Sequence, residues 1–171
     1  PAFSVAIHAK CPVSIIRHNL RPLPSPEFPI VVGTDGSESS AGAVMEAARL
    51  ASETGATLKI DSAYAAPSNT PWLIAKYPPG MHEGEDPNVW ERQVFDPDLD
   101  GTSSDQRRRG AANMARDAGD LVAEKYPNVP IELIVASGRP ERVIVEAAED
   151  ASVIVVGARG RGDFASLLLG S

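Results

Sequence analysis

Short apolar runs alternate with longer segments of helical pattern from Ile30 to the end of this chain. The runs lie in "IVVGTDG", "ATLKIDSAY", "VPIELIVAS" and "SVIVVGA". Continuous apolar runs bounded by turn residues are typical of strands that are buried on both faces of a parallel sheet. Strands that alternate with helices need right-handed crossovers, which make the strands parallel and place helices against the sheet. The sequence therefore predicts an α/β fold with an open parallel sheet.

The segments between the strands carry recognisable helix ends. Ser37 or Ser39 is the expected cap of the first helix, and Gly55 is its expected stop. Pro140 suits the first turn of the last helix. Helices are predicted over 37–55, 105–126 and 138–151.

Composition narrows the classes of function. A chain of 171 residues with a net charge of −7 is about one domain, and its charge argues against a general nucleic-acid surface. The basic stretch "QRRRGAANMAR" is better explained as a solvated helix face. No apolar run is long enough to cross a membrane, and no signal peptide is apparent at the start. Cys11 is the single cysteine, which fits a cytoplasmic location.

The long segment 65–103 is rich in proline, aspartate and glycine, and is predicted to be a loop without regular structure. It contains "DPDLDG", which begins at Asp96 and copies the start of a calcium loop. The twelfth position is Arg107 instead of the required glutamate, so no calcium site is expected. His8 and Cys11 are a poor zinc signal because no second pair accompanies them. We expect no metal site made by protein residues.

Glycine and polar residues follow two of the predicted strands, in "VVGTDG" and "VVGARGRG". In a sheet with the strand order 3-2-1-4-5 these two strand ends are neighbours and flank the point where the winding direction reverses. Ligands bind at that point in open α/β sheets. Glycine lets the backbone approach a ligand closely, and loop amides with nearby guanidinium groups bind phosphate oxygens. The alternative is a solvated basic turn.

Three stretches of the chain, "GTDGSESSAGAVMEAARLA", "GRPERVIVEAAEDASVIVVGARGRG" and the terminal "GS", resemble a universal stress protein domain. The nucleotide-binding branch of that family has the pattern G-x2-G-x9-G-[ST]. Gly157, Gly160, Gly170 and Ser171 fit this pattern with both spacings. The resemblance implies a Rossmann-like sheet of five parallel strands in the order 3-2-1-4-5, with helices on both faces.

The same resemblance implies that ATP, with or without Mg²⁺, is the cofactor. Asp35 would contact the adenine or ribose, or alternatively would cap the helix that follows it. Ala63 would meet the adenine through its backbone, or is an ordinary strand end. Arg159 and Arg161 would screen phosphate charge, or are solvated. The implied nucleotide-binding residues are Gly33, Thr34, Asp35, Ala63, Gly157, Arg159, Gly160, Arg161, Gly170 and Ser171.

The resemblance also divides the chain. Residues 1–18 look like the terminal helix and strand of a preceding or permuted stress-protein domain, 19–29 is a proline-rich linker, and 30–171 is a domain that stops after its "GS" motif. We expect Cys11–Arg17 to be the fifth strand, beside Ser152–Val156, because an uncovered apolar edge strand is a liability. Sequence leaves open whether this segment packs within its own chain or on a partner chain.

The predicted function is an ATP-binding regulatory module in stress or growth control, which acts as a homodimer or as a tandem pair of domains joined through the fifth-strand edge. No nucleophile–base pair and no P-loop lysine motif are apparent, so we expect no catalytic residues and at most slow ATP hydrolysis. The alternative is a structural or interaction protein of the same fold that binds no nucleotide. A nucleotidyl-transferring enzyme fits less well, because its usual Ser-Gly-Gly loop does not follow the first strand.

Overall fold

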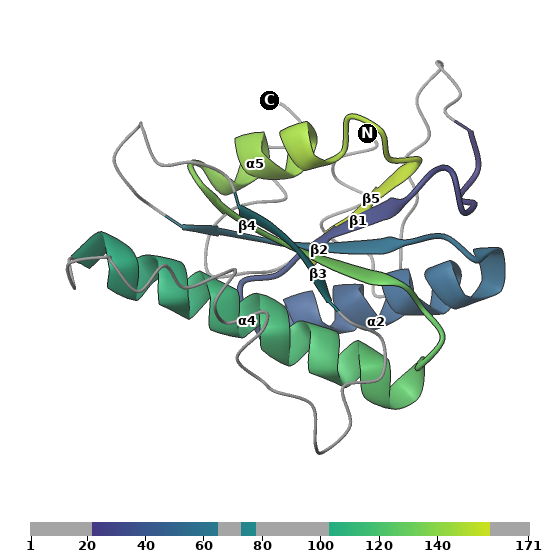
Figure 1. The fold of residues 1–171 in the computed structure, drawn as a ribbon, viewed down its shortest axis with the longest axis horizontal. Helices are drawn as coiled ribbons and strands as arrows, with labels where there is room; N and C mark the ends of the chain where they lie inside the picture. Colours follow the sequence, from purple (N-terminus) through teal and green to yellow (C-terminus); the bar gives the residue numbers. More distant parts are fainter. Residues whose placement is uncertain (1–21, 65–72, 78–102, 158–171) are drawn as a thin grey trace, which may run out of the picture.

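The structure is a computed structural model, and it describes residues 22–64, 73–77 and 103–157. One mixed sheet is covered by helices on both faces (Figure 1). The elements, in chain order, are β1 (Ile30–Gly33), α2 (Glu38–Thr54), β2 (Leu58–Tyr64), β3 (Leu73–Tyr77), α4 (Ser103–Lys125), β4 (Ile131–Ser137), α5 (Pro140–Ala147) and β5 (Val153–Val155).

Four of the strands form the parallel part of the sheet. β1 pairs with β2 on one side and with β5 on the other, and β2 pairs with β4, all in parallel. The order β4-β2-β1-β5 is the predicted order 3-2-1-4, so this part of the prediction is confirmed. The predicted fifth strand, Cys11–Arg17, lies outside the described residues.

The prediction of an entirely parallel sheet is wrong at the other edge. β3 runs antiparallel to β4, with Leu73 opposite Val135 and Tyr77 opposite Ile131. The strand comes from 65–103, which the sequence predicted to be a loop without regular structure. β3 forms because β4 would otherwise leave backbone N–H and C=O groups unpaired along an exposed edge. The same physical reason predicts a strand beside Ser152–Val156.

Among the described elements, helices cover both faces of the sheet. In Figure 1, α2 and α4 lie below the sheet and α5 lies above it. The larger core cluster therefore lies between the sheet and the helices α2 and α4, and includes Ile30, Val44, Leu58, Ile60 and Val122. The smaller cluster lies under α5 and consists of Val31, Ile134, Ala136, Val143, Ile144, Ala147, Ala148 and Ala151.

The ends of α2 follow from capping chemistry. The Ser40 amide donates to Ser37 Oγ at 3.2 Å, so Ser37, and not Ser39, is the N-cap. Gly55 ends the helix with a φ of 71°, in the left-handed region that favours glycine, and its amide donates to the Ala51 carbonyl at 2.8 Å. Both predicted helix ends are confirmed. Because Ser37 is the N-cap, α2 begins only a few residues after the end of β1.

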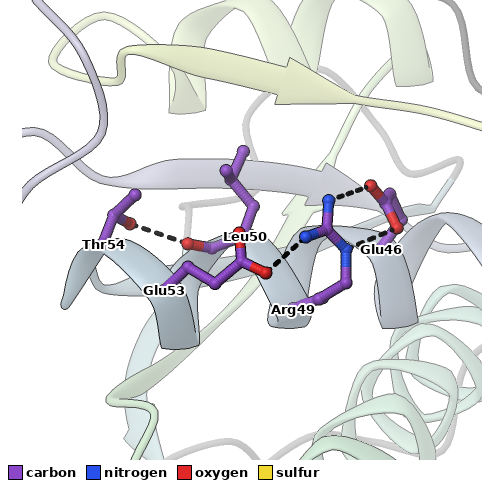
Figure 2. A network of polar contacts seen from close by, with 5 residues as sticks. All are labelled: Glu46, Arg49, Leu50, Glu53 and Thr54. Carbon is purple, nitrogen blue, oxygen red and sulfur yellow. Dashed lines mark hydrogen bonds and ion pairs between the residues drawn. The ribbon is translucent and has the colours of Figure 1, made fainter.

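The outer surface of α2 carries charged side chains. Figure 2 shows Arg49 between Glu46 and Glu53, with Arg49 Nε donating to Glu46 Oε2 at 3.1 Å. Thr54 Oγ1 donates to the Leu50 carbonyl at 2.8 Å near the end of the same helix. Exposed ion pairs of this kind contribute at most about 1 kcal/mol each. These side chains therefore form a solvent-exposed face of α2.

β5 is less covered than the sequence predicted. Ile154 is 40% exposed, although an apolar run of this kind predicted burial on both faces. Within the described residues, β5 pairs with β1 alone. None of the described helices combines the length and the apolar character that crossing a bilayer would need.

Candidate functional site

A tight turn, Thr34–Gly36, follows β1 at the carboxyl edge of the sheet. The Thr34 amide donates to the Asp61 carbonyl at 2.8 Å, which extends the pairing of β1 with β2 by one residue. Gly36 has a φ of 73°, and its amide donates to Thr34 Oγ1 at 3.4 Å. The backbone therefore bends at Gly36, in the left-handed region that favours glycine.

Asp35 is held at the apex of this turn by the start of α2. The Ser37 amide donates to Asp35 Oδ1 at 3.0 Å, and the Asp35 amide donates to Ser40 Oγ at 3.4 Å. The Ser40 hydroxyl is buried and donates to the Ser37 carbonyl at 2.9 Å. Asp35 therefore supports the helix start without being its N-cap. The Ser37 amide positions its carboxylate and the Ser40 hydroxyl positions its backbone, and neither serine was predicted to belong to the site.

Gly33 and Ala63 lie on the α5 side of the sheet. A Cβ at Gly33 would lie 3.1 Å from Ile144 Cδ1, so α5 packs directly over this strand end. Ala63 is opposite Ala136 of β4 and packs against the smaller core cluster. Both small residues therefore lie under α5, at or next to the carboxyl ends of β1 and β2.

Gly157 brings the end of β5 against the first turn of α2. A Cβ at Gly157 would lie 2.7 Å from Ser39 Oγ and 2.9 Å from the Ser39 carbonyl oxygen, closer than real Cβ atoms approach. The backbone of the predicted phosphate loop therefore begins in contact with the helix that follows Asp35. Because α2 and α5 cover opposite faces, this contact lies where the winding direction of the sheet reverses, between β1 and β5.

The structure thus brings together five of the predicted site residues at one edge of the sheet, namely Gly33, Thr34, Asp35, Ala63 and Gly157. The other five, Arg159, Gly160, Arg161, Gly170 and Ser171, lie outside the described residues. The first weak metal motif, 8–11, lies outside the described residues, and so do residues 96–102 of the second motif, 96–107. Within the described ranges, no group of three or more His, Cys, Asp or Glu side chains could hold a metal ion.

Asp61 is a buried acidic residue next to the site that the sequence analysis did not single out. Its residue exposure is 3%, and burial raises the pKa of its carboxyl group to about 7. Asp61 is opposite Gly33 of β1 and Ile134 of β4. The only sequence signal was an acidic residue in the middle of the apolar strand "LKIDSAY", which does not reveal on its own whether the side chain is covered.

The chain is similar to known proteins over most of its length. The model of the universal stress protein family matches residues 28–171. One universal stress protein of Mycobacterium tuberculosis is 32% identical over 165 residues, which are 96% of this chain and 46% of the relative. Another is 33% identical over 169 residues, covering 98% of this chain and 48% of the relative. The chain therefore spans about half the length of these curated relatives.

Solved structures of similar fold agree with this match. A universal stress protein crystallised in complex with cAMP superposes with a TM-score of 0.51 at 28% identity, covering 86% of this chain and 87% of that protein. A protein of the universal stress protein family from Burkholderia pseudomallei gives a TM-score of 0.50 at 19% identity, over 85% of this chain and 89% of that protein. The second likeness shows the fold alone.

Proposed function

Because the chain belongs to the universal stress protein family, we propose that it binds an adenine nucleotide, ATP, at the carboxyl ends of β1, β2 and β5. The observation that carries this proposal is the contact between Gly157 and Ser39, which joins the start of the predicted phosphate loop to the Asp35 turn. The cAMP complex of the similar stress protein supports an adenine nucleotide as the ligand class.

Each site residue has a separate role in the proposal. The Asp35 carboxylate accepts hydrogen bonds from the ribose hydroxyls or from the adenine amino group, and Gly33, Thr34 and Ala63 offer backbone beside the base. Backbone amides bind phosphate oxygens well where glycines allow a close approach. Phosphate binding is assigned to Gly157, Gly160, Gly170 and Ser171, with Arg159 and Arg161 screening the charge and Mg²⁺ as an optional companion of ATP.

The proposed role is regulatory. Nucleotide binding would change how the protein interacts with partners in stress or growth control in the cytoplasm, with hydrolysis slow or absent.

A second candidate function is an interaction protein of the same fold that binds no nucleotide. It follows from the partly exposed edge at β5, where Ile154 is 40% exposed. Identifying the small molecules released from the denatured protein separates the two. Released ATP supports the first, and a protein purified free of nucleotide that also fails to bind added ATP supports the second.

The domain arrangement is also a proposal. Since the chain spans about half of its relatives, we assign 30–171 to one stress-protein domain, 1–18 to the last helix and strand of a neighbouring or permuted domain, and 19–29 to a linker. Pairing through the β5 edge, with Cys11–Arg17 of the same chain or of a partner, is consistent with β5 having β1 as its single neighbour within the described residues.

Replacing Asp35 tests the nucleotide site. Asp35→Ala is expected to weaken ATP binding by roughly 1–3 kcal/mol, because a charged hydrogen-bond acceptor is lost. Isothermal titration calorimetry measures the change. Asp35→Asn is the matched control, since its side-chain oxygen still accepts from the Ser37 amide but carries no charge.

If Asp35 contacts the ligand as a carboxylate, the asparagine variant keeps the stability of the parent and loses affinity. If Asp35 serves the turn alone, Asp35→Asn binds ATP as the parent does, which would contradict the assignment. Unfolding by urea, run on both variants, separates a loss of affinity from a loss of folded protein.

A further inference from the structure

The carboxyl group of Asp61 in β2 is buried under α5, and one of its two oxygens has no hydrogen-bond donor among the described residues. Leu58 and Ile60 of β2 belong to the larger core cluster, so Asp61, which alternates with them, points to the α5 face. Asp61 Oδ1 has no hydrogen-bond partner in the described part of the chain. Asp61 lies opposite Ile134, which belongs to the smaller core cluster with Val143 and Ile144 of α5. The ionised form of a carboxyl group in such surroundings is costly.

Asp61 also touches the proposed ligand site through the backbone. Its carbonyl accepts the Thr34 amide at 2.8 Å, and its partner on β1 is Gly33. The Cβ direction of Gly33 points at Ile144 Cδ1, 3.1 Å away. The same short stretch of β2 therefore supports the packing of α5 above and the Thr34–Gly36 turn beside it.

The charged groups on this face do not compensate Asp61. Lys59 is two residues earlier on β2 and is ion-paired with Asp150 at 2.7 Å. Glu132, opposite Lys59 on β4, has the same sign as Asp61 and adds no attraction. β1 contributes Val31 and Gly33 to this face, and the buried residues of α5 are apolar, namely Val143, Ile144 and Ala147. Lys76 of β3 is opposite Glu132 and so lies on this face by register, but β4 separates its strand from β2. Arg142 of α5 is exposed and is ion-paired with Glu146.

We infer that Asp61 is a pH-responsive residue whose ionisation loosens the packing of α5 and disturbs the Thr34–Gly36 turn, so that nucleotide affinity falls as the pH rises. An ionised carboxylate under α5 is less costly when water reaches it, and water reaches it when α5 moves away from the strand ends. Burial raises the pKa of Asp61 to about 7, which places the change near neutral pH. The effect on affinity rests on the proposed function, whereas the effect on α5 and the turn does not.

Amide chemical shifts test the conformational part without any ligand. In the full chain, the amide chemical shifts of Thr34 and Ile144 are expected to change with pH, with a midpoint at about pH 7. This change should be absent in Asp61→Asn and Asp61→Val. Asp150→Asn is the control, because it removes an exposed carboxylate from the same face and leaves the titration in place. Midpoints at the ordinary aspartate value of about 4, or the same titration in Asp61→Asn, would overturn the inference.

The affinity part uses cAMP as the probe, because its phosphodiester lacks the second ionisation that a terminal phosphate has at about 6. The affinity of the parent chain should fall roughly fivefold between about pH 6 and 8, because proton and ligand binding are reciprocally coupled. Asp61→Asn should show little change. An equal pH dependence in both proteins would overturn the coupling. Failure to bind both cAMP and ATP at any pH would count against the proposed function, while the amide titration would still decide the role of Asp61.

Discussion

Asp61→Asn is expected to be more stable than the parent protein at about pH 8, by roughly 2–4 kcal/mol, and to have nearly the same stability at about pH 4. The pKa of Asp61 is raised from its ordinary value of 3.8 to about 7 by burial. The folded protein therefore holds this proton more tightly than the unfolded chain does. The stability that the protonated group contributes is present below about pH 4 and is lost as the pH rises to about 7.

Urea unfolding at several pH values between about 4 and 8 measures this effect as a difference between the two proteins. Asp150→Asn is the control, because Asp150 is 65% exposed and pairs with Lys59 on the same face. Its curve should be displaced from that of the parent by less than about 1 kcal/mol and should keep the same slope with pH. Parallel curves for the parent and Asp61→Asn would show that Asp61 is not a neutral buried acid.

Gly157→Ala is expected to destabilise the protein by roughly 2–3 kcal/mol and to lower nucleotide affinity at least about tenfold. The added methyl group would lie 2.9 Å from the Ser39 carbonyl oxygen and 3.0 Å from the Ser39 carbonyl carbon. Both are backbone atoms of α2, so the helix or the end of β5 must move. A displaced loop no longer begins beside the Asp35 turn, which is why affinity should fall together with stability.

Gly42→Ala is the matched control for the size of the added group. A Cβ at Gly42 would meet nothing within 4 Å, and the residue lies inside α2, so the change should stabilise the protein by about 0.5–1 kcal/mol. Ser39→Ala combined with Gly157→Ala removes the contact with Ser39 Oγ and leaves the backbone contacts, so it should restore only part of the loss. Unfolding by urea and titration with cAMP measure both quantities. A Gly157→Ala protein as stable as its parent would contradict the close contact.

Local chemistry was enough to predict the helices, whereas the order of the parallel strands was implied by the resemblance to the family. The cap at Ser37 and the left-handed stop at Gly55 act within a few residues, and the structure has both where the sequence predicted them. The glycines and Asp35 at the strand ends could be assigned to one edge because the carboxyl ends of parallel strands meet there. The residues of this group that the structure describes do lie at that edge.

Contacts between distant segments decided the rest. β3 was not predictable, since an antiparallel edge strand depends on the open side of β4 and not on a local pattern. The burial of Asp61 likewise depends on α5, which covers that face of β2. Lys59 lies two residues earlier on the same face and forms an ion pair with Asp150, which is distant in the sequence. Sequence by itself determined where α2 begins and ends and which glycine and polar residues follow the strands, because capping and periodicity are local. Only the tertiary structure decided that Gly157 touches Ser39 and that Asp61 Oδ1 is buried without a hydrogen-bond partner among the described residues, because both depend on how the layers pack.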